Sequence, residues 1–295
     1  MQKDQIRRLI DSTLSEDGMV ETGVRGLQLF RVTEAVRCAP AVYEPSIIAI
    51  LSGAKEAILD GRRHVYDERQ YLCCPMSMPV EAGTPTASHE APLLGVYIAL
   101  DRRMMTELAI EMERAGGVIR KPAVATPPPG LALAHWDDDF TEALLRLLQL
   151  AVTGGTDRAV LAEGRLRELY FAVLKGEARA SVRRAFGVGN EIARTVEFLS
   201  SRLAGPVSIE EMAAEVGMSR AVFHRRFKQA TTLSPIQFVK SMRLNTAAMK
   251  IAGGMTVSEA AMQVGYVSTS QFSREFKRLY GQSPRHWGQA RHCHP

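Results

Sequence analysis

Apolar residues near the C-terminus recur every three or four positions, which is the spacing of one face of an α-helix. Phe272 and Phe276 lie four positions apart and therefore share a buried face. Ser268 precedes them, where its hydroxyl can accept hydrogen bonds from the N–H groups of the first helical turn. Gly281 follows them and can end the helix in the left-handed conformation. The pattern predicts a helix between Ser268 and Gly281, preceded by a tight turn at Gly265 and a shorter amphipathic helix.

The same pattern occurs once earlier in the chain. Val216-Gly217 recurs 48 positions later as Val264-Gly265. Four further positions recur at a shift of 49: Phe223, Phe227, Pro235 and Phe238 correspond to Phe272, Phe276, Pro284 and Trp287. Two units of helix, tight turn and second helix form an internal repeat of the helix-turn-helix motif. Residues 235–252 predict one long helix between the units, which would hold the two reading helices about 34 Å apart if they enter successive major grooves.

The second helix of each unit presents a polar and cationic face opposite its phenylalanines. In the second unit this face carries Thr269, Ser270, Ser273, Arg274 and Lys277, whose side chains suit the base edges and phosphates of a major groove. Residues 190–295 contain 14 Lys or Arg and 7 Asp or Glu, a net charge of +7, so the rest of the chain carries −2 of the total +5. Such a local excess suits phosphate neutralisation. A solvated basic face without a partner is the simpler alternative, which the adjacent motifs disfavour.

Residues 190–287 resemble the DNA-binding domain of AraC/XylS-type bacterial transcription regulators. The second unit carries the resemblance most clearly, through GY at 265–266, SxSxFSRxFK at 268–277, GxSP at 281–284 and the aromatic Trp287. The resemblance implies double-stranded DNA as a partner. It places the base-reading residues at Ala221, His224 and Arg225 in the first unit, with the cationic Arg220 and Lys228 beside them, and at Thr269, Ser270, Ser273 and Arg274 in the second unit, with Lys277.

The N-terminal third contains short apolar or alternating runs separated by turn residues, the pattern of a β-barrel or β-sandwich. The runs are residues 27–36, 46–51, 55–59, 61–66, 71–74 and 93–100. Residues 20–115 resemble the cupin-like N-terminal domain of one AraC-type subgroup, through GRRHVYDERQYL at 61–72, MPV at 78–80, Ala87-Ser88 and LLGVYIALD ending at Asp101. The resemblance implies a domain that binds an unknown small-molecule effector, forms a homodimer, or does both, and a contact with RNA polymerase if the protein is an activator.

We expect the effector pocket inside the barrel, because small barrels enclose ligand-sized cavities lined by alternate strand residues. The residues assigned to it are Ile47, Arg62, Tyr66, Cys73 and Tyr97. The two tyrosines offer apolar surface with a hydroxyl that can orient a polar ligand, and Arg62 could pair with an anionic one. The alternative is that these side chains only fill the barrel.

The predicted fold class is therefore α+β, with a cupin-like β-barrel, a helical middle segment and an all-α domain of two helix-turn-helix units. The expected domains are residues 1–115 for sensing or dimerisation, 116–189 for the helical segment and linker, and 190–295 for DNA binding. Within the middle segment, residues 137–150 and 156–174 predict paired amphipathic helices, and three prolines make residues 125–130 a stiff loop. Residues 175–189 are the expected linker.

Two other functions use features of the sensor half. A metal-dependent cupin enzyme fused to a DNA-binding module would need clustered histidines, but His64 and His89 are far apart in the sequence and no His-x-His motif accompanies them. His292-Cys293-His294 lies on the terminal segment and is interpreted as incidental. A thiol-based sensor would use Cys73 or Cys74, adjacent strand residues of which one should face the barrel interior.

We expect no cofactor and no catalysis. The charged first residues, and the lack of any apolar run long enough to cross a bilayer, predict a cytoplasmic protein without a membrane partner.

Overall fold

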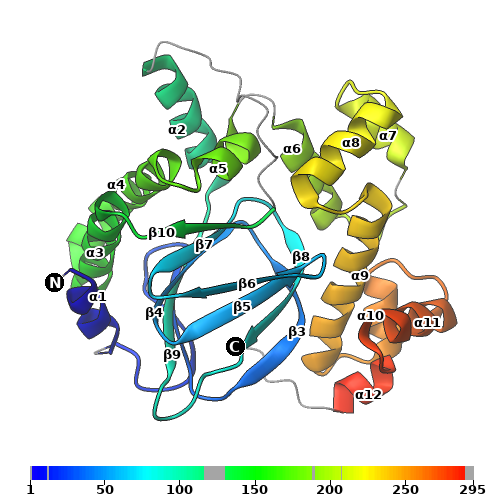
Figure 1. Ribbon diagram of the computed structural model, residues 1–295, viewed down its shortest axis with the longest axis horizontal. Coiled ribbons are helices and arrows are strands. Elements are labelled where there is room, and N and C mark those ends of the chain that lie inside the picture. The colour runs from blue at the N-terminus through cyan, green and yellow to red at the C-terminus, as the bar shows by residue number, and fades with distance from the viewer. Residues whose placement is uncertain (1, 12, 116–129, 188–189, 207, 290–295) are drawn as a thin grey trace.

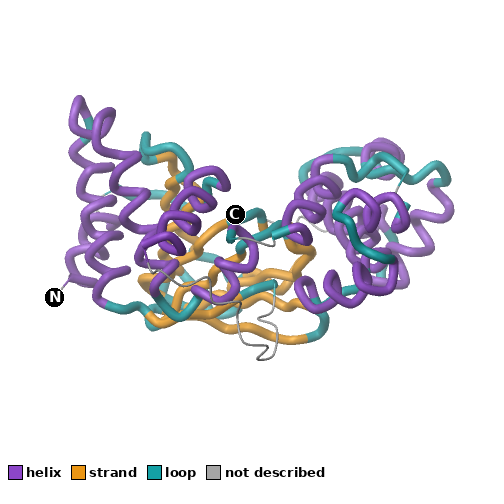
Figure 2. The backbone as a smooth tube through the Cα atoms, turned by 90° about the horizontal axis from the view of Figure 1, so that it is seen from above, coloured by secondary structure: helices purple, strands orange, loops and turns teal. Residues whose placement is uncertain are grey.

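The computed structural model describes residues 2–11, 13–115, 130–187, 190–206 and 208–289. The predicted α+β class is confirmed, because the N-terminal half is rich in strands and the C-terminal half is helical (Figure 1). The C-terminal helices α9 to α12 lie on one side of the strands, and helices α1, α3 and α4 lie on the other side (Figure 1), as the view from above also shows (Figure 2).

The described strands form two antiparallel sheets. The first sheet has six strands in the order β1 (Gly18–Glu21), β2 (Leu27–Val32), β9 (Leu93–Ala99), β4 (Ser46–Ser52), β7 (Gln70–Cys74) and β10 (Ala132–His135). The second sheet has four strands in the order β3 (Val36–Tyr43), β8 (Met78–Thr84), β5 (Ala54–Leu59) and β6 (Arg62–Asp67).

The expected closed barrel is therefore replaced by two separate sheets, since no pairing among the described strands joins one sheet to the other. The predicted single strand over residues 27–36 shows the reason. It ends at Val32, and the chain leaves the first sheet before β3 begins at Val36 in the second. Gly53 makes a similar crossing between β4 and β5 at φ +78°, where an added Cβ would lie 3.2 Å from Leu93 Cα.

Helices cover the outer face of the six-stranded sheet. Helix α3 (Asp138–Thr153) is capped by Asp137, whose carboxylate accepts a hydrogen bond from Phe140 N at 2.8 Å. The Phe140 ring then stacks on Tyr71 of β7, with ring centroids 4.2 Å apart. Helix α4 (Gly155–Lys175) packs beside α3 and is tied to the sheet by Tyr170, whose hydroxyl donates to Ala99 O at 2.5 Å. Helix α2 (Arg102–Ala115) is preceded by Asp101, whose carboxylate accepts a hydrogen bond from Met104 N at 2.9 Å.

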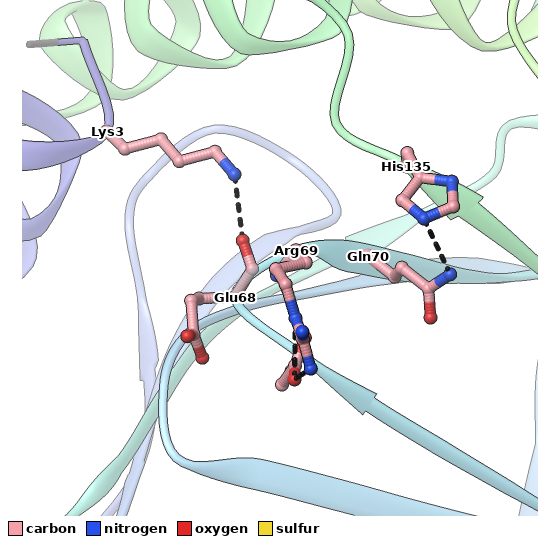
Figure 3. A network of polar contacts seen from close by, with 6 residues as sticks. Lys3, Glu68, Arg69, Gln70 and His135 are labelled. Carbon is pink, nitrogen blue, oxygen red and sulfur yellow. Dashed lines mark hydrogen bonds and ion pairs between the residues drawn. The ribbon is translucent and has the colours of Figure 1, made fainter.

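A surface network of polar contacts fastens the N-terminal helix α1 (Gln2–Asp11) to the β6–β7 turn (Figure 3). Lys3 Nζ donates to Glu68 O at 2.8 Å. On the other side of the turn, Gln70 Nε2 lies 3.2 Å from His135 Nε2 on β10. These contacts therefore join the first helix to the β6–β7 turn and add a side-chain contact to the β7–β10 pairing.

The segment expected as a linker contains helix α5 (Arg179–Phe186). Its Val182, Ala185 and Phe186 are buried, and their three- and four-residue spacing is a helical signal that the glycines on either side obscure. Residues 125–129 of the expected stiff loop lie outside the described residues.

The C-terminal half consists of two consecutive helix-turn-helix units. The first contains α7 (Ile209–Glu215) and α8 (Arg220–Thr231), after α6 (Glu191–Ser201), and the second contains α10 (Val257–Gln263) and α11 (Thr269–Tyr280), before α12 (Pro284–Gln289). Helix α9 (Pro235–Ala252) joins them as one continuous helix, as predicted. The predicted end of α11 is also confirmed, because Gly281 adopts φ +74°. Gly265 has φ +88°, and a Cβ there would lie 2.7 Å from Ala204 O, so this turn requires glycine.

The repeated aromatic positions form equivalent small cores. Phe227 lies between Phe223 and Phe238, at centroid distances of 5.5 and 5.3 Å. In the second unit Phe276 lies between Phe272 and Trp287, at 5.4 and 5.9 Å. Each unit therefore buries its aromatic side chains and leaves the opposite face of its second helix open.

The start of α9 offers a test of local helix capping. Ser234 and Gln237 form a capping box, in which each side chain bonds the other residue's backbone N–H. We expect Ser234→Ala to lower the free energy of unfolding by about 1 kcal/mol, because one first-turn N–H loses its acceptor. Ser241→Ala in the middle of α9 is the control and should change it by less than about 0.5 kcal/mol. Chemical denaturation measures both, and equal effects would contradict the capping role.

Candidate DNA interface and sensor interior

The outer face of α8 carries the residues assigned to DNA reading in the first unit. Ala221, His224, Arg225 and Lys228 are exposed, on the side opposite the buried phenylalanines. Arg220 is also exposed, but its Nη1 forms an ion pair with Glu210 Oε1 of α7 at 2.8 Å. Among the described residues, His224 and Arg225 make no hydrogen bond or ion pair through their side chains, so both are available to a partner.

The corresponding face of α11 is open in the same way. Thr269, Ser270, Arg274 and Lys277 are exposed, and Ser273 is half-buried. Arg274 also lines a surface hollow of about 400 Å³ with Gln271, Glu275 and Arg278. Sequence reasoning did not assign Arg278, although its position four residues after Arg274 places the two guanidinium groups on the same side of the helix.

Glu275 anchors α11 to its neighbours. Its carboxylate accepts hydrogen bonds from Tyr266 Oη at 2.8 Å and Gln271 Nε2 at 3.3 Å, and it pairs with Lys240 Nζ of α9 at 2.9 Å. Burial acts to raise the pKa of Glu275, but the hydrogen bonds from Lys240, Tyr266 and Gln271 outweigh it and lower that pKa. The carboxylate is thus held in its charged form, which fixes the orientation of the second reading helix.

Part of the basic charge in this half therefore serves the fold. Arg243 of α9 donates from Nε to Leu203 O at 2.8 Å and from Nη2 to Gly205 O at 2.7 Å. Together with Lys240 and Arg220, it is engaged within the protein. A count of charges over residues 190–295 therefore overestimates the number of cations that are free to bind phosphates. The tertiary contacts distinguish the cations engaged within the protein from those that are free.

The five residues assigned to an effector pocket do not share one surface. Ile47 opposes both Cys73 and Ile98 in the sheet register, and directly opposed residues of antiparallel strands project to the same face. Tyr71 is on that face too and stacks on α3, so Ile47 and Cys73 point toward the helical layer. Tyr97 opposes Ile48 and therefore projects from the other face.

The interior between the two sheets contains Tyr66 and Cys74. Tyr66 Oη lies 3.3 Å from Tyr43 Oη, and Cys74 Sγ lies 3.7 Å from Tyr43 O. Arg62, at the start of β6, is exposed. One cysteine of the pair does face inward as expected, but it is Cys74 and not Cys73. The face was assigned wrongly because strand pairing decides it, and the sequence contains no local signal for that pairing.

Lys55 is a half-buried residue on the inward strand face that sequence reasoning missed. It opposes the buried Tyr66 in the β5–β6 pairing and shares its strand face with the buried Ala57 and Leu59. Its Nζ lies 5.5 Å from the centre of the Phe30 ring, and burial lowers its pKa to about 8. Among the described residues no carboxylate lies within ion-pair distance of this ammonium group. The sequence did contain a signal for this, because residues 55, 57 and 59 alternate along the strand and therefore share one face.

The surroundings of the three described cysteines disfavour the thiolate form of their side chains. Burial, and then the adjacent Glu56, raise the pKa of Cys38 to about 12, and its Sγ donates to Glu56 Oε1 at 3.0 Å. Burial alone raises the pKa of Cys73 to about 12, and it also raises the pKa of Cys74. Reactive sensor cysteines need a lowered pKa and access to solvent, so this environment disfavours the thiol-sensor alternative.

Within the described part of the chain, no three His, Cys, Asp or Glu residues lie close enough together to hold a metal ion. His292, Cys293 and His294 are outside that part. None of the helices that the structure describes is both long and apolar enough to span a membrane.

Comparison with known proteins supports both halves of this architecture. Residues 23–181 match the family model of the AraC-type transcriptional regulator N-terminus, and residues 212–290 match a helix-turn-helix domain model. MtrA of Neisseria gonorrhoeae, an HTH-type transcriptional regulator, is 41% identical over 78 residues, which are 26% of this chain and 26% of MtrA. RhaS of Escherichia fergusonii, an HTH-type transcriptional activator, is 26% identical over 175 residues, which are 54% of this chain and 58% of RhaS. The matches thus span about a quarter and somewhat over half of these relatives.

The fold is similar to that of ToxT from Vibrio cholerae. One structure of ToxT superposes with a TM-score of 0.54 at 11% sequence identity, covering 89% of this chain and 97% of ToxT. The N-terminal family model alone matches more than half of the 295 residues. With its two helix-turn-helix units, the chain belongs to the AraC-type family of transcriptional regulators.

Proposed function

We propose that the protein is a cytoplasmic transcription regulator that binds operator DNA through α8 and α11. The observation that supports this most directly is the pair of open reading faces, one on each unit, joined by the single continuous helix α9. A reading helix enters the major groove with its exposed polar side chains toward the base edges. The homodimer, and a contact with RNA polymerase if the protein is an activator, stay predictions.

Binding should depend steeply on salt, because each phosphate neutralised by Lys or Arg releases a condensed counterion. The duplex for this measurement can be selected from a random pool by the full-length protein. Affinity that is flat between low and moderate salt, or a failure to enrich any sequence, would contradict the proposed function.

The two reading arginines should differ in what they contribute. Arg225 makes no side-chain contact within the described protein and is placed to reach a base edge, so Arg225→Ala should reduce discrimination at one position of the site by ~1–3 kcal/mol. Arg274 shares a surface hollow with Arg278, so we expect it to contact the backbone and Arg274→Ala to weaken all sequences about equally. A binding panel of single-base variants of the selected duplex measures both.

Arg103→Ala on α2 is the matched control for loss of charge, since Arg103 lies on the sensor surface and pairs with Glu107. It should leave both affinity and specificity unchanged. An Arg225→Ala profile identical to that of the wild type would remove Arg225 from base reading.

We also propose that the sensor half responds to a small amphipathic acid held between the two sheets. Lys55 supports this, because a cation on an inward strand face, beside Phe30 and without a carboxylate partner among the described residues, would be stabilised by a ligand anion. Tyr66 and Tyr97 project toward the same interior and can orient a polar group. Structures of ToxT are described with an unsaturated fatty acid and with (E)-4-(8-methylnaphthalen-1-yl)but-3-enoic acid, both carboxylic acids.

Lys55→Met tests this part of the proposal, with oleic acid as the probe. Oleic acid should raise the melting temperature of the wild type, because a ligand that binds only the folded state stabilises it. Its affinity should fall as the pH rises above about 8, since the lysine of the free protein then loses the charge that attracts the carboxylate. Lys55→Met should lower the affinity by roughly tenfold or more, the loss of one charge-assisted hydrogen bond, and remove the pH dependence.

Lys175→Met is the control, because Lys175 lies on the surface in an ion pair with Asp139. Its response to oleic acid should match that of the wild type. Equal affinities of Lys55→Met and wild type would exclude Lys55 from the site, and no stabilisation of the wild type would exclude long-chain acids as the effector class.

A further inference from the structure

Asn245 of α9 is a buried polar residue at the junction of the sensor and the second helix-turn-helix unit. It is only 5% exposed. Its Nδ2 donates to two sensor carbonyl oxygens, Ala41 O of β3 and Val80 O of β8, both at 2.8 Å. Its Oδ1 accepts a hydrogen bond from Tyr280 Oη of α11 at 2.6 Å. Exchanging the nitrogen and oxygen of this amide would place the oxygen against two carbonyl oxygens, so the contacts allow one orientation.

The two carbonyl oxygens belong to residues that face each other across the sheet, because Ala41 is the register partner of Val80 in the β3–β8 pair. Asn245 is therefore bonded to two neighbouring sensor strands at once, and its hydrogen bonds depend on the relative position of these strands. A shift of either strand would stretch one of the two bonds, and leaving a buried donor or acceptor unpaired is unfavourable. Movement of β3 or β8 relative to α9 would therefore break at least one of these buried hydrogen bonds.

Tyr280 continues the connection into the core of the second unit. It is the last residue of α11, and its ring lies 4.6 Å from that of Phe276 and 5.5 Å from that of Trp287. Burial, and then the charge of Glu81 on β8, raise the pKa of Tyr280 well above its usual value. The hydroxyl is thus protonated and can donate to Asn245. Tyr280 therefore connects the core of the second unit to Asn245, whose other hydrogen bonds are to the sensor.

Apolar contacts accompany the hydrogen bonds. Ala39 of β3 is buried and belongs to the same apolar cluster as Leu244 and Ala247 of α9 and Phe276 of α11. The aromatic core of the first unit belongs instead to the large cluster, which includes α5, α6 and the sensor core with Val80 of β8. Among the described buried sensor residues, Ala39 of β3 is the one that belongs to the core of the second unit.

We propose that Asn245 and Tyr280 are positioning residues through which the β3–β8 pair of the sensor sets the placement of the reading helix α11. The inference rests on the proposed DNA-binding function and names how the sensor regulates it. A fully bonded buried polar network has few alternative arrangements, so it transmits a displacement better than apolar packing alone. Coupling between two sites is reciprocal, so DNA binding at α11 must also change the conformational stability of β3 and β8.

This reciprocity allows a test that needs no known effector. Amide hydrogen exchange of the full-length protein is measured by mass spectrometry with and without a selected DNA duplex, at duplex concentrations that saturate each variant. In the wild type, DNA should change the exchange rates of β3 and β8 amides by about fivefold or more, the lower end of typical coupling. Tyr280→Phe removes only the hydroxyl and keeps the ring contacts, and it should abolish this response.

Asn245→Leu removes all three hydrogen bonds at similar volume and should have the same effect, alone or combined with Tyr280→Phe. Lys250→Met is the matched control, because it breaks another side-chain contact of α9, the hydrogen bond to Gln263 of α10, that involves neither the sensor nor α11. It should keep the β3–β8 response. If Asn245→Leu does not fold, Tyr280→Phe decides the test.

A wild-type protein that binds DNA without any change in β3 or β8 would overturn the inference and leave the proposed function intact. A response that survives Tyr280→Phe would also overturn it. If no duplex binds the wild type, the proposed function fails, and this inference fails with it.

Discussion

Helix α9 is the constraint on which the arrangement of the C-terminal half depends. Phe238, Val239 and Met242 in its first half belong to the core that includes the first helix-turn-helix unit. Leu244, Ala248 and Ile251 in its second half belong to the core of the second unit. Because one rigid helix contributes to both cores, neither unit can turn about it without losing buried apolar contacts. The spacing of the two reading faces is therefore a property of this helix.

The polar residues of α9 extend this role to its neighbours. Arg243 binds the segment that follows α6, Lys240 pairs with Glu275 on α11, and Asn245 bonds the sensor strands. Each of these side chains meets its partner in a partly or fully buried site, where an unpaired polar group would be unfavourable. Arg225 and Arg274 on the reading faces are exposed instead. The basic residues bound by or carried on α9 therefore hold the domain together, whereas those of the reading faces are available to DNA.

The sensor half follows a different constraint, the alternation of side chains across two sheets. One face of the six-stranded sheet packs against α3 and α4, and the other faces the second sheet. A residue can therefore contribute to helix packing or to the interior, but not to both. Lys55, Tyr66 and Cys74 are on the interior side, whereas Ile47 and Cys73 support the helical layer. A binding site between the sheets must be built from the first group.

Much of the C-terminal half was predictable from the sequence because its signals are local. The caps Ser234 and Ser268, the glycines at 265 and 281, and phenylalanines one helical turn apart act within one or two turns. Their recurrence in the second half of the domain then identified the two units. The exposed positions of the reading residues followed from the same periodicity. The helix α5 was missed, because its apolar spacing extends over only two turns between glycines.

The sensor half depended on pairing between strands distant in the sequence. The alternation of a strand shows that two faces exist, but only its neighbours decide which face is inside. Cys73 was therefore placed in the interior in place of Cys74, and one barrel was expected where the chain forms two sheets. The contact of Asn245 with Ala41 and Val80 joins segments far apart in the chain, and no local pattern marks it. The sequence by itself determined the two helix-turn-helix units, because their periodicity and caps are local. Only the tertiary structure decided which residues face the sensor interior and how the sensor meets the second reading helix, because both depend on long-range packing.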